Sequence, residues 1–167
     1  MSDPSSTATL LFLREEELRQ GMELLFCADR DLASLVDSQL AEMNLDEVHL
    51  RILQLVGRTP QITVTSLSDQ LKLTKQSLGR ALEPLLANDL VLQRVGPRDR
   101  RQRLLSLTEA GATLERRLSQ RLMTRLAKAY REAGSQAVEG FRRVLIGLLE
   151  DADERQRFER RTPTTRS

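Results

Sequence analysis

Residues 63–85, TVTSLSDQLKLTKQSLGRALEPL, decide the fold of this 167-residue chain. Thr63 and Thr74 each stand before a short stretch in which leucine recurs at helical spacing, and a threonine hydroxyl is a common cap of a helix N-terminus. A turn at Lys72 and Leu73 separates the two stretches. The leucines expected to face inward are Leu67, Leu71, Leu78, Leu82 and Leu85. The stretch therefore predicts two short helices joined by a tight turn, which is a helix-turn-helix.

A basic hairpin is predicted directly after these helices. Residues 90–95 and 103–107 are short β-like runs on either side of GPRDRR at residues 96–101. Because Gly and Pro punctuate turns, this arrangement predicts a two-stranded β-hairpin, a wing beside the helix-turn-helix. Between Leu71 and Arg103 the chain carries eight basic and three acidic residues, whereas the net charge of the whole chain is only +2. The positive charge is thus concentrated in one segment.

Helical patterns flank this segment on both sides. Residues 11–43 keep helical spacing of apolar positions, and Asp46 is placed to cap a second helix that ends near Gly57. Residues 108–134 and 138–149 predict two further helices. Aromatic residues make up only 3% of the chain and Trp is absent, which suits a core of packed aliphatic helices. We therefore predict a mainly α fold: a winged helix-turn-helix with a two-stranded wing and long terminal helices.

These patterns divide the chain into segments. Residues 46–108 form the predicted winged helix-turn-helix domain, and residues 10–45 and 109–153 form a helical dimerisation region. The apolar stripes of these outer helices are wider than the small winged core needs, so a second subunit would have to cover them. A monomer with intramolecular helix packing is the alternative. We expect residues 1–9 and the basic tail 154–167 to be disordered.

Composition argues against several classes of function. No apolar stretch approaches the roughly 20 residues of a membrane span, and the N-terminus lacks a signal pattern, so we expect a soluble cytoplasmic protein. The single cysteine, Cys27, and the single histidine, His49, are too few for an internal disulfide or a four-ligand zinc site. We expect no metal and no cofactor. Because no catalytic triad, paired carboxylates or glycine-rich phosphate loop is visible, we predict that the chain is not an enzyme.

The order of elements and several motifs resemble the MarR family of bacterial transcription regulators. The most specific motif is DRR at residues 99–101 followed by LTEAG at residues 107–111, which is similar to that family's wing signature, Asp-x-Arg followed by Leu-Thr-x-x-Gly. TKQSL at residues 74–78 and AYREAG at residues 129–134 are similar to the PetP-like branch of the family in alphaproteobacteria. The resemblance spans roughly residues 18–149. It implies a homodimer that binds a pseudo-palindromic double-stranded DNA operator under the control of a small aromatic or phenolic effector.

The second helix of the predicted helix-turn-helix carries polar residues suited to reading DNA. A helix fits the major groove, where its first turns reach base edges while caps and amides meet phosphates. Because glutamine pairs with adenine and arginine with guanine, we predict base contacts from Gln76 and Arg80, and Gly79 would let the backbone come close. The predicted DNA contacts of the two helices are Thr65, Thr74, Lys75, Gln76, Ser77, Gly79 and Arg80. The competing interpretation is the solvated face of an ordinary surface helix.

Arginines cluster in the predicted wing, and guanidinium groups are favoured in a narrow minor groove, where the potential is most negative. In the family the arginine of the Asp-x-Arg motif is the usual wing contact. The resemblance therefore implies Arg101 as the first contact, with Asp99 orienting the arginines through a charge-assisted hydrogen bond. The predicted DNA contacts of the wing are Arg98, Asp99, Arg100, Arg101 and Arg103. A solvated run of charge is the alternative.

Two residues depart from the family pattern. Pro84 falls inside the predicted second helix, where proline removes a hydrogen bond to the carbonyl of Arg80 and costs about 3 kcal/mol. We expect a kink there, just beyond the base-reading turns. Asp89 stands where the family usually has glycine, and aspartate tolerates the left-handed conformation better than most residues.

The resemblance also implies a dimer interface and an effector pocket. In the family the N- and C-terminal helices of two subunits interlock. The implied interface residues are Leu18, Met22, Leu25, Phe141, Leu145, Leu148 and Leu149. The implied pocket, between the winged core and these helices, comprises Phe26, Arg30, His49 and Ile52. His49 is equally compatible with a packing or capping role.

Two alternative functions stay open. One MarR subgroup senses peroxides through a cysteine in its first helix, which suggests redox sensing by Cys27, although that helix has no tyrosine to hydrogen-bond a thiolate. A buried structural cysteine is the competing interpretation. The second alternative is a winged-helix module that uses its basic face for a partner other than DNA; Gln76, Arg80 and Arg101 favour DNA.

Overall fold

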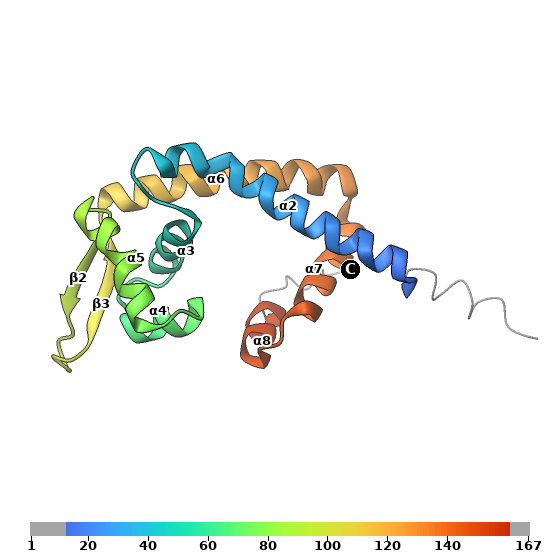
Figure 1. Cartoon of the computed structure of the whole chain (residues 1–167). Coiled ribbons are helices and arrows are strands. Elements are labelled where there is room, and N and C mark those ends of the chain that lie inside the picture. The colour runs from blue at the N-terminus through green and yellow to red at the C-terminus, as the bar shows by residue number, and fades with distance from the viewer. Residues whose placement is uncertain (1–12, 161–167) are drawn as a thin grey trace, which may run out of the picture. The chain divides into compact units, whose positions relative to one another are not determined.

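The computed structural model describes residues 13–160, and the chain divides into two compact units, Met1–Leu122 and Met123–Ser167 (Figure 1). The elements of the first unit are α2 (Glu15–Ala41), α3 (Glu47–Arg58), β1 (Ile62–Thr63), α4 (Val64–Leu71), α5 (Lys75–Ala87), β2 (Val91–Val95), β3 (Arg103–Leu107) and the first part of α6 (Glu109–Ala133). The second unit holds the rest of α6, α7 (Ser135–Leu148) and α8 (Ala152–Arg160). The predicted mainly α fold is confirmed.

The two threonine caps and the tight turn between them fix the helix-turn-helix. Thr63 Oγ1 accepts a hydrogen bond from the amide of Ser66, and Thr74 Oγ1 accepts one from the amide of Ser77, each over 3.1 Å. Between the helices Lys72 takes the left-handed conformation with φ 53°. The buried hydroxyl of Ser68 donates a hydrogen bond to the carbonyl of Leu73 over 2.6 Å. The turn is therefore held by local bonds that the sequence pattern predicts.

The predicted two-stranded hairpin is confirmed as β2 and β3, and a third strand, β1, extends it to an antiparallel sheet in the order β1-β3-β2. β2 pairs with β3 from Val91 opposite Leu107 to Val95 opposite Arg103. The additional strand β1 is only two residues long, with Ile62 opposite Leu105. Two residues are too short to show strand alternation, and only the completed fold reveals that Ile62 buries its side chain beside β3.

The core of the first unit is aliphatic, as the composition predicts. Leu53 and Val56 of α3 and Leu67 of α4 are fully buried, and α3 contacts α2, α4, α5 and β3. α3 is therefore the helix around which the unit packs. Leu105 of β3 and Leu85 of α5 are fully buried in the same cluster. This packing leaves the opposite face of α5 exposed to solvent.

Two departures from the family pattern are accommodated near the end of α5. The helix continues through Pro84 to Ala87, so the proline does not end it, and the predicted kink stays a prediction. The carbonyl of Pro84 accepts bonds from the backbone amide and the side-chain amide of Asn88. Asp89 takes the left-handed conformation with φ 52°, which confirms the expectation for this position.

The second unit contains a helix where we expected disorder. Asp151 Oδ1 accepts hydrogen bonds from the amides of Asp153 and Glu154, which caps α8, and Arg155 donates to the carbonyl of Gly147 over 3.3 Å. α8 also has acidic residues in its first turn and basic ones in its last, which suits the helix dipole. The expectation of a disordered tail is therefore wrong for residues 154–160. Residues 1–9 and 161–167 lie outside the described part of the chain.

Within residues 13–160, no helix combines the length and the apolar character needed to span a membrane.

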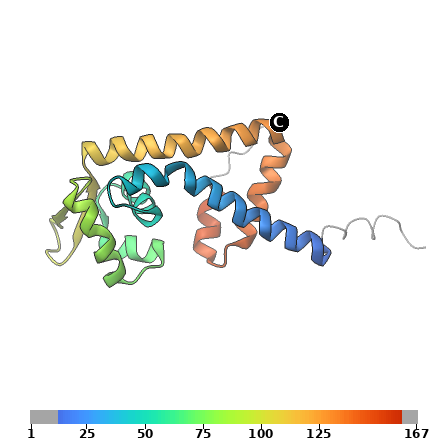
Figure 2. The same ribbon diagram turned by 45° about the horizontal axis from the view of Figure 1, so that its top comes forward.

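In the second unit α7 has no buried residue, and its Phe141 contacts Tyr130 of α6 edge to face, with ring centroids 6.4 Å apart. Figure 2 shows α6 as one continuous helix. Its first turns pack onto the core through Leu114 and Leu118, both buried.

Candidate nucleic-acid interface

The first two turns of α5 present a polar face to solvent. Lys75, Gln76, Gly79 and Arg80 are exposed, whereas Leu78 between them is fully buried in the core. Since the buried leucine fixes the rotation of α5 about its axis, these polar residues must point away from the core. The structure thus brings the predicted base-reading residues onto one exposed helix face, the geometry that enters a major groove.

Thr74 and Ser77 hold the start of α5 rather than pointing freely outward. The Thr74 hydroxyl accepts from the amide of Ser77 and donates to the Ser77 hydroxyl over 2.9 Å. Both hydroxyls therefore have partners before any ligand arrives, although each keeps a lone pair for a further donor or water. Thr65, in the first turn of α4, is exposed and belongs to the same helix-turn-helix.

The cations of α5 form no ion pair within the described part of the chain. Neither Lys75 nor Arg80 forms an ion pair with a described carboxylate, and the nearby Glu83, on the next turn of α5, is not bonded to either of them. An unpaired surface cation is available to an external phosphate or base without first breaking an internal bond.

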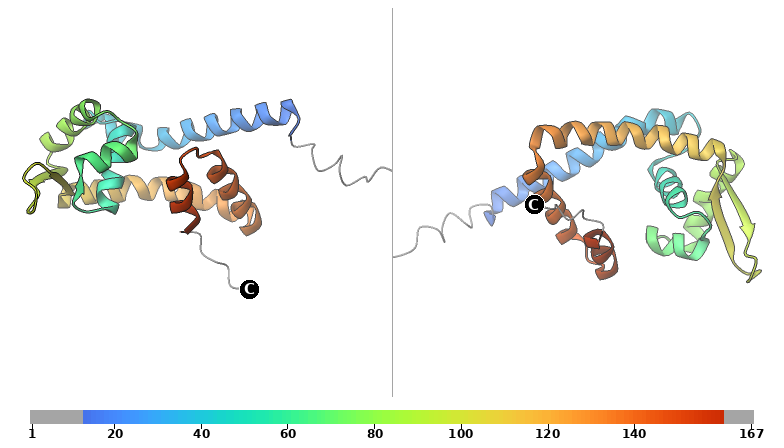
Figure 3. Two further views of the ribbon diagram at one scale, coloured as in Figure 1. Left: turned by 90° about the horizontal axis from the view of Figure 1, so that it is seen from below. Right: turned by 180° about the vertical axis from the view of Figure 1, so that it is seen from behind.

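Backbone bonds order the turn at the tip of the wing. The amide of Gly96 donates to the carbonyl of Gln102 over 3.0 Å, and the amide of Gln102 donates to the carbonyl of Asp99 over 3.1 Å. A Cβ on Gly96 would lie 2.8 Å from the Asp99 carbonyl oxygen, so the loop closes tightly only with glycine here. The wing, a hairpin extending beyond the helices, is visible in both panels of Figure 3.

Asp99 orders the wing in a different way from the predicted one. Its carboxylate Oδ1 accepts the backbone amide of Arg101 over 2.9 Å, and the described residues give it no bond to an arginine side chain. Arg103 makes the other stabilising contact, because its guanidinium Nη1 donates to the carbonyl of Arg100 over 3.0 Å. Sequence spacing predicts that an aspartate helps the turn, but not whether it binds a guanidinium or an amide.

The remaining wing arginines are exposed and unpaired within the described residues. Arg98, Arg100 and Arg101 form no ion pair there. Two further exposed cations were missing from the predicted contacts: Lys72 in the helix-turn-helix turn and Arg94 on β2. Both are visible in the sequence as basic residues of the same segment, but only the fold places them on the surface of this unit. The whole segment therefore presents a basic surface.

The four predicted effector-pocket residues differ in exposure and in their bonding partners, and their role as a pocket stays a prediction. Ile52 is fully buried and Phe26 is 70% exposed, while the Arg30 guanidinium donates to Asp31 over 2.9 Å. His49 is buried and completes a capping box at the start of α3, with its Nδ1 3.0 Å from the amide nitrogen of Asp46. The alternative interpretation of His49 as a capping residue is thus confirmed.

The capping box also affects the ionisation of Asp46. Desolvation alone would raise the pKa of the Asp46 carboxyl, but hydrogen bonds with the His49 side chain and with the amides of His49 and Val48 outweigh it. Together they hold the pKa of Asp46 below its usual value of 3.8. A carboxylate that accepts several bonds at a helix N-terminus stays ionised, which supports the cap at neutral pH.

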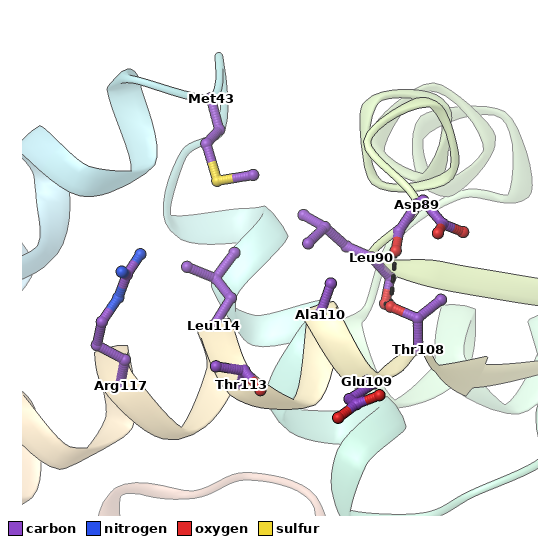
Figure 4. A pocket seen from close by; sticks show the side chains of 9 residues that line it. All are labelled: Met43, Asp89, Leu90, Thr108, Glu109, Ala110, Thr113, Leu114 and Arg117. Carbon is purple, nitrogen blue, oxygen red and sulfur yellow. Dashed lines mark hydrogen bonds between the residues drawn. The ribbon is translucent and has the colours of Figure 1, made fainter.

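Among the hollows of the first unit is an open depression of about 650 Å³ at the start of α6, with an apolar floor that includes Leu90 and Leu114 (Figure 4). Beside it the Thr108 hydroxyl donates to the carbonyl of Asp89 over 2.6 Å. A smaller hollow, about 140 Å³, lies between α2 and α3 and reaches Leu122 of α6. None of the four predicted effector-pocket residues lines either hollow.

The residues assigned to a dimer interface are largely exposed in the single chain. The exposed ones are Leu18, Met22, Leu25, Phe141, Leu145 and Leu148, and Leu149 is half-buried. Cys27 is also half-buried and forms no disulfide. So much exposed aliphatic and aromatic surface on α2 and α7 is unusual for an isolated soluble chain.

Known proteins resemble this chain in the same segment, the helix-turn-helix and the wing. A sequence model of the MarR family matches residues 43–102, which contain the helix-turn-helix and most of the wing. The HTH-type transcriptional regulator PetP of Rhodobacter capsulatus is 46% identical over 144 residues, covering 86% of this chain and 87% of that protein.

Solved structures with the same fold include two complexes with DNA. Streptococcus pneumoniae FabT in complex with DNA superposes with a TM-score of 0.68 at 18% identity, covering 78% of this chain and 94% of FabT. A mutant MarR from E. coli complexed with operator DNA gives a TM-score of 0.63 at 22% identity, covering 83% of this chain and 98% of that chain.

Proposed function

Because this chain belongs to the MarR family of transcriptional regulators, we propose that it binds a specific double-stranded DNA operator as a homodimer. The observation that carries this proposal is the exposed polar face of α5, where Lys75 and Arg80 form no ion pair with any described residue. Solved complexes of FabT and of E. coli MarR with DNA share the fold and support this use of the surface.

Base recognition falls to α5 and minor-groove contact to the wing. Gln76 and Arg80 lie in the first two turns of α5, where side chains reach base edges, and Arg101 lies at the tip of the hairpin. The exposed cations around them supply salt-sensitive phosphate affinity that does not depend on sequence. Thr74 and Ser77 hold the start of α5 in register through their mutual hydrogen bonds.

The exposed apolar surface of α2 and α7 supports the homodimer. Leu18 and Met22 on α2, and Leu145 and Leu148 on α7, would otherwise stay in water. A two-fold dimer places two α5 helices about one DNA turn apart, and its operator is therefore a pseudo-palindrome. Such a regulator works where the bacterial chromosome is, in the cytoplasm.

A small effector that changes DNA affinity is part of the proposal, and catalysis is not. The family match describes regulators rather than enzymes. Use of the basic face by a partner other than DNA is the alternative function, and the unpaired Arg80 and Lys75 on a groove-sized helix favour DNA over it. Redox control through Cys27 has less support, since no tyrosine lies on α2 to hydrogen-bond its thiolate.

Selection of genomic fragments by the purified protein tests this function. Fragments are bound in solution, recovered and sequenced over several rounds at near-physiological salt. We expect one enriched pseudo-palindrome whose half-sites lie about 10 base pairs apart, or a multiple of that spacing. Enrichment without a common sequence would favour the alternative of a general basic surface.

A further inference from the structure

A proline lies in the interior of α5. The helix continues beyond Pro84 to Ala87, so this proline stands well past the first turn, where proline is tolerated. Because proline has no N–H, the helical hydrogen bond from position 84 to the carbonyl of Arg80 cannot form, and the proline ring crowds that carbonyl. No other helix among residues 13–160 contains a proline. The least favourable residue for a helix interior is therefore found in the helix that we expect to read DNA.

The part of α5 from Pro84 onward is firmly held. Leu85 is fully buried, and the amide of Leu90 donates to the Leu85 carbonyl over 2.9 Å. The carbonyl of Pro84 accepts two hydrogen bonds from Asn88, one from the backbone amide over 3.0 Å and one from the side-chain amide over 2.8 Å. These bonds fix the end of α5 to the segment that leads into β2.

The first two turns of α5, residues 75–80, are attached in a different way. We call them the reading turns. They contain one buried side chain, Leu78, and Thr74 caps them through its bond with the amide of Ser77. The carbonyl that lacks its helical partner, that of Arg80, lies at the end of these turns, where they meet the firmly held part. A helix changes direction most readily at such a place, so the direction of the reading turns depends on Pro84.

That direction matters for base recognition. A bidentate contact with a base edge has a fixed geometry, and Gln76 and Arg80 can make it only if the reading turns enter the groove at the right angle. Natural sequences break a local structural rule chiefly where a function requires it, and stability is often lower there as a result. An interior proline directly after the reading turns fits this pattern.

We propose that Pro84 is a positioning residue for operator recognition, which directs the reading turns so that Gln76 and Arg80 reach their bases. Its side chain has no polar atom that could read a base edge, so it acts through those two residues. This role rests on the proposed function, because it concerns the same DNA-binding helix. When the proline is removed, stability and sequence selectivity should change in opposite directions.

Pro84→Ala tests the proposal, because it restores the missing donor and removes the ring. We expect the Tm, measured by circular dichroism, to rise by about 5 °C or more. Operator affinity, measured by fluorescence anisotropy, should fall about tenfold, the size of one good base contact. Affinity for a scrambled duplex and the slope of log affinity against log salt should stay unchanged, since no charge is altered.

Pro60→Ala is the matched control. Pro60 is exposed in the loop between α3 and β1, where its replacement restores no helical bond. Because a loop proline restricts the unfolded chain, this change should not raise the Tm, and it should leave the preference for the operator unchanged.

A double-mutant cycle with Arg80→Ala separates positioning from a general effect on α5. If Pro84 acts through Arg80, Pro84→Ala should weaken operator binding by about threefold or less in the Arg80→Ala background, instead of about tenfold. A loss that is equally large in both backgrounds would show that Pro84 does not act through Arg80, and would overturn the assignment.

Three further results overturn the proposal. The first is a Pro84→Ala protein with the operator preference of the wild type, and the second is a variant that loses affinity for both duplexes alike. The third is a loss of operator affinity with a Tm no higher than that of the wild type, since Pro84 would then only support the fold. A wild-type protein without preference for any operator contradicts the proposed function and this role together. A selective wild type with an equally selective Pro84→Ala contradicts this role alone.

Discussion

Gly111 explains why one motif of the sequence requires glycine. A Cβ at this position would lie 1.9 Å from the carbonyl oxygen of Leu90, which is backbone and cannot turn aside. The amide of Gly111 donates to the Thr108 hydroxyl, which in turn donates to the carbonyl of Asp89. The start of α6 is thus in direct contact with the start of β2, and the wing is fixed relative to the core.

Gly111→Ala should destabilise the protein by about 1–3 kcal/mol or more, because the added methyl group forces the two backbones apart. Urea unfolding followed by circular dichroism measures the change. Gly79→Ala is the control, since a Cβ there meets nothing within 4 Å in a helix interior, and it should be neutral or stabilising by up to about 1 kcal/mol. Equal stability of the two variants would show that the close approach at Gly111 is not structural.

Arg80→Ala should cost about 1–3 kcal/mol of binding free energy on the selected operator and relax the base preference at one position of each half-site. The reason is the exposed, unpaired guanidinium on the second turn of α5. Fluorescence anisotropy with the operator and single-base variants of it gives both quantities. An unchanged preference at every base would remove Arg80 from the base-reading set.

Arg101→Ala should weaken binding to most duplexes alike and reduce the slope of log affinity against log salt by about 1. Its side chain is exposed at the wing tip, and Asp99 binds its amide rather than its guanidinium, so the turn should survive the change. Titrations on matched and scrambled duplexes at several salt concentrations measure it. A loss confined to the operator would instead make Arg101 a base-reading residue.

At the level of the elements, the cap of α3 links stability to pH. Asp46→Ala should destabilise the protein by about 0.5–2 kcal/mol at neutral pH, since it removes the acceptor for two backbone amides.

Because the folded state depresses the pKa of Asp46, the contribution of its charge to the free energy of unfolding is present above the usual pKa of 3.8 and is lost as the pH falls through the lower folded value. Unfolding curves at pH 7 and pH 3 for the wild type and Asp46→Asn isolate the charge. Their difference should shrink at the lower pH, and a constant difference would contradict the assignment.

The helices were largely predictable and the strands less so. Caps at Asp46, Thr63, Thr74 and Thr108 are encoded in single side chains next to periodic leucines, so local sequence is enough to place the helices that they begin. β1 was missed because two residues carry no period, and its existence depends on β3 lying beside it. α8 was missed because a charged segment resembles a tail until Asp151 is seen to cap it.

The outward face of α5 was predictable from the sequence, but the bonds around the candidate site were not all predictable. A buried Leu78 fixes which residues of α5 face outward, and that follows from spacing alone. The partner of Asp99 and the convergence of side chains into a hollow depend on distances between elements that are remote in sequence. For that reason spacing alone could not predict which residues line the hollow between α2 and α3.

At the level of the whole molecule, dimerisation and DNA affinity should be lost together. Replacing Leu145 and Leu148 of α7 by Asp places charges on a surface that we assign to the interface, on a helix that has no buried residue in the described chain. We expect a monomer by sedimentation equilibrium and at least a tenfold weaker operator affinity. Glu139→Gln, on the same helix, is the control and should stay dimeric. A double variant that remains a dimer would contradict the assigned interface.

The most direct test of the central claim is the anisotropy of a fluorescent operator duplex titrated with the purified protein, against a scrambled duplex of the same composition, at two salt concentrations. We predict tight binding to the operator, binding to the scrambled duplex weaker by a factor of about 10³ or more, and a loss of affinity for both at the higher salt. Equal affinity for the two duplexes would contradict the account, because α5 would then contact DNA, if at all, without reading its sequence.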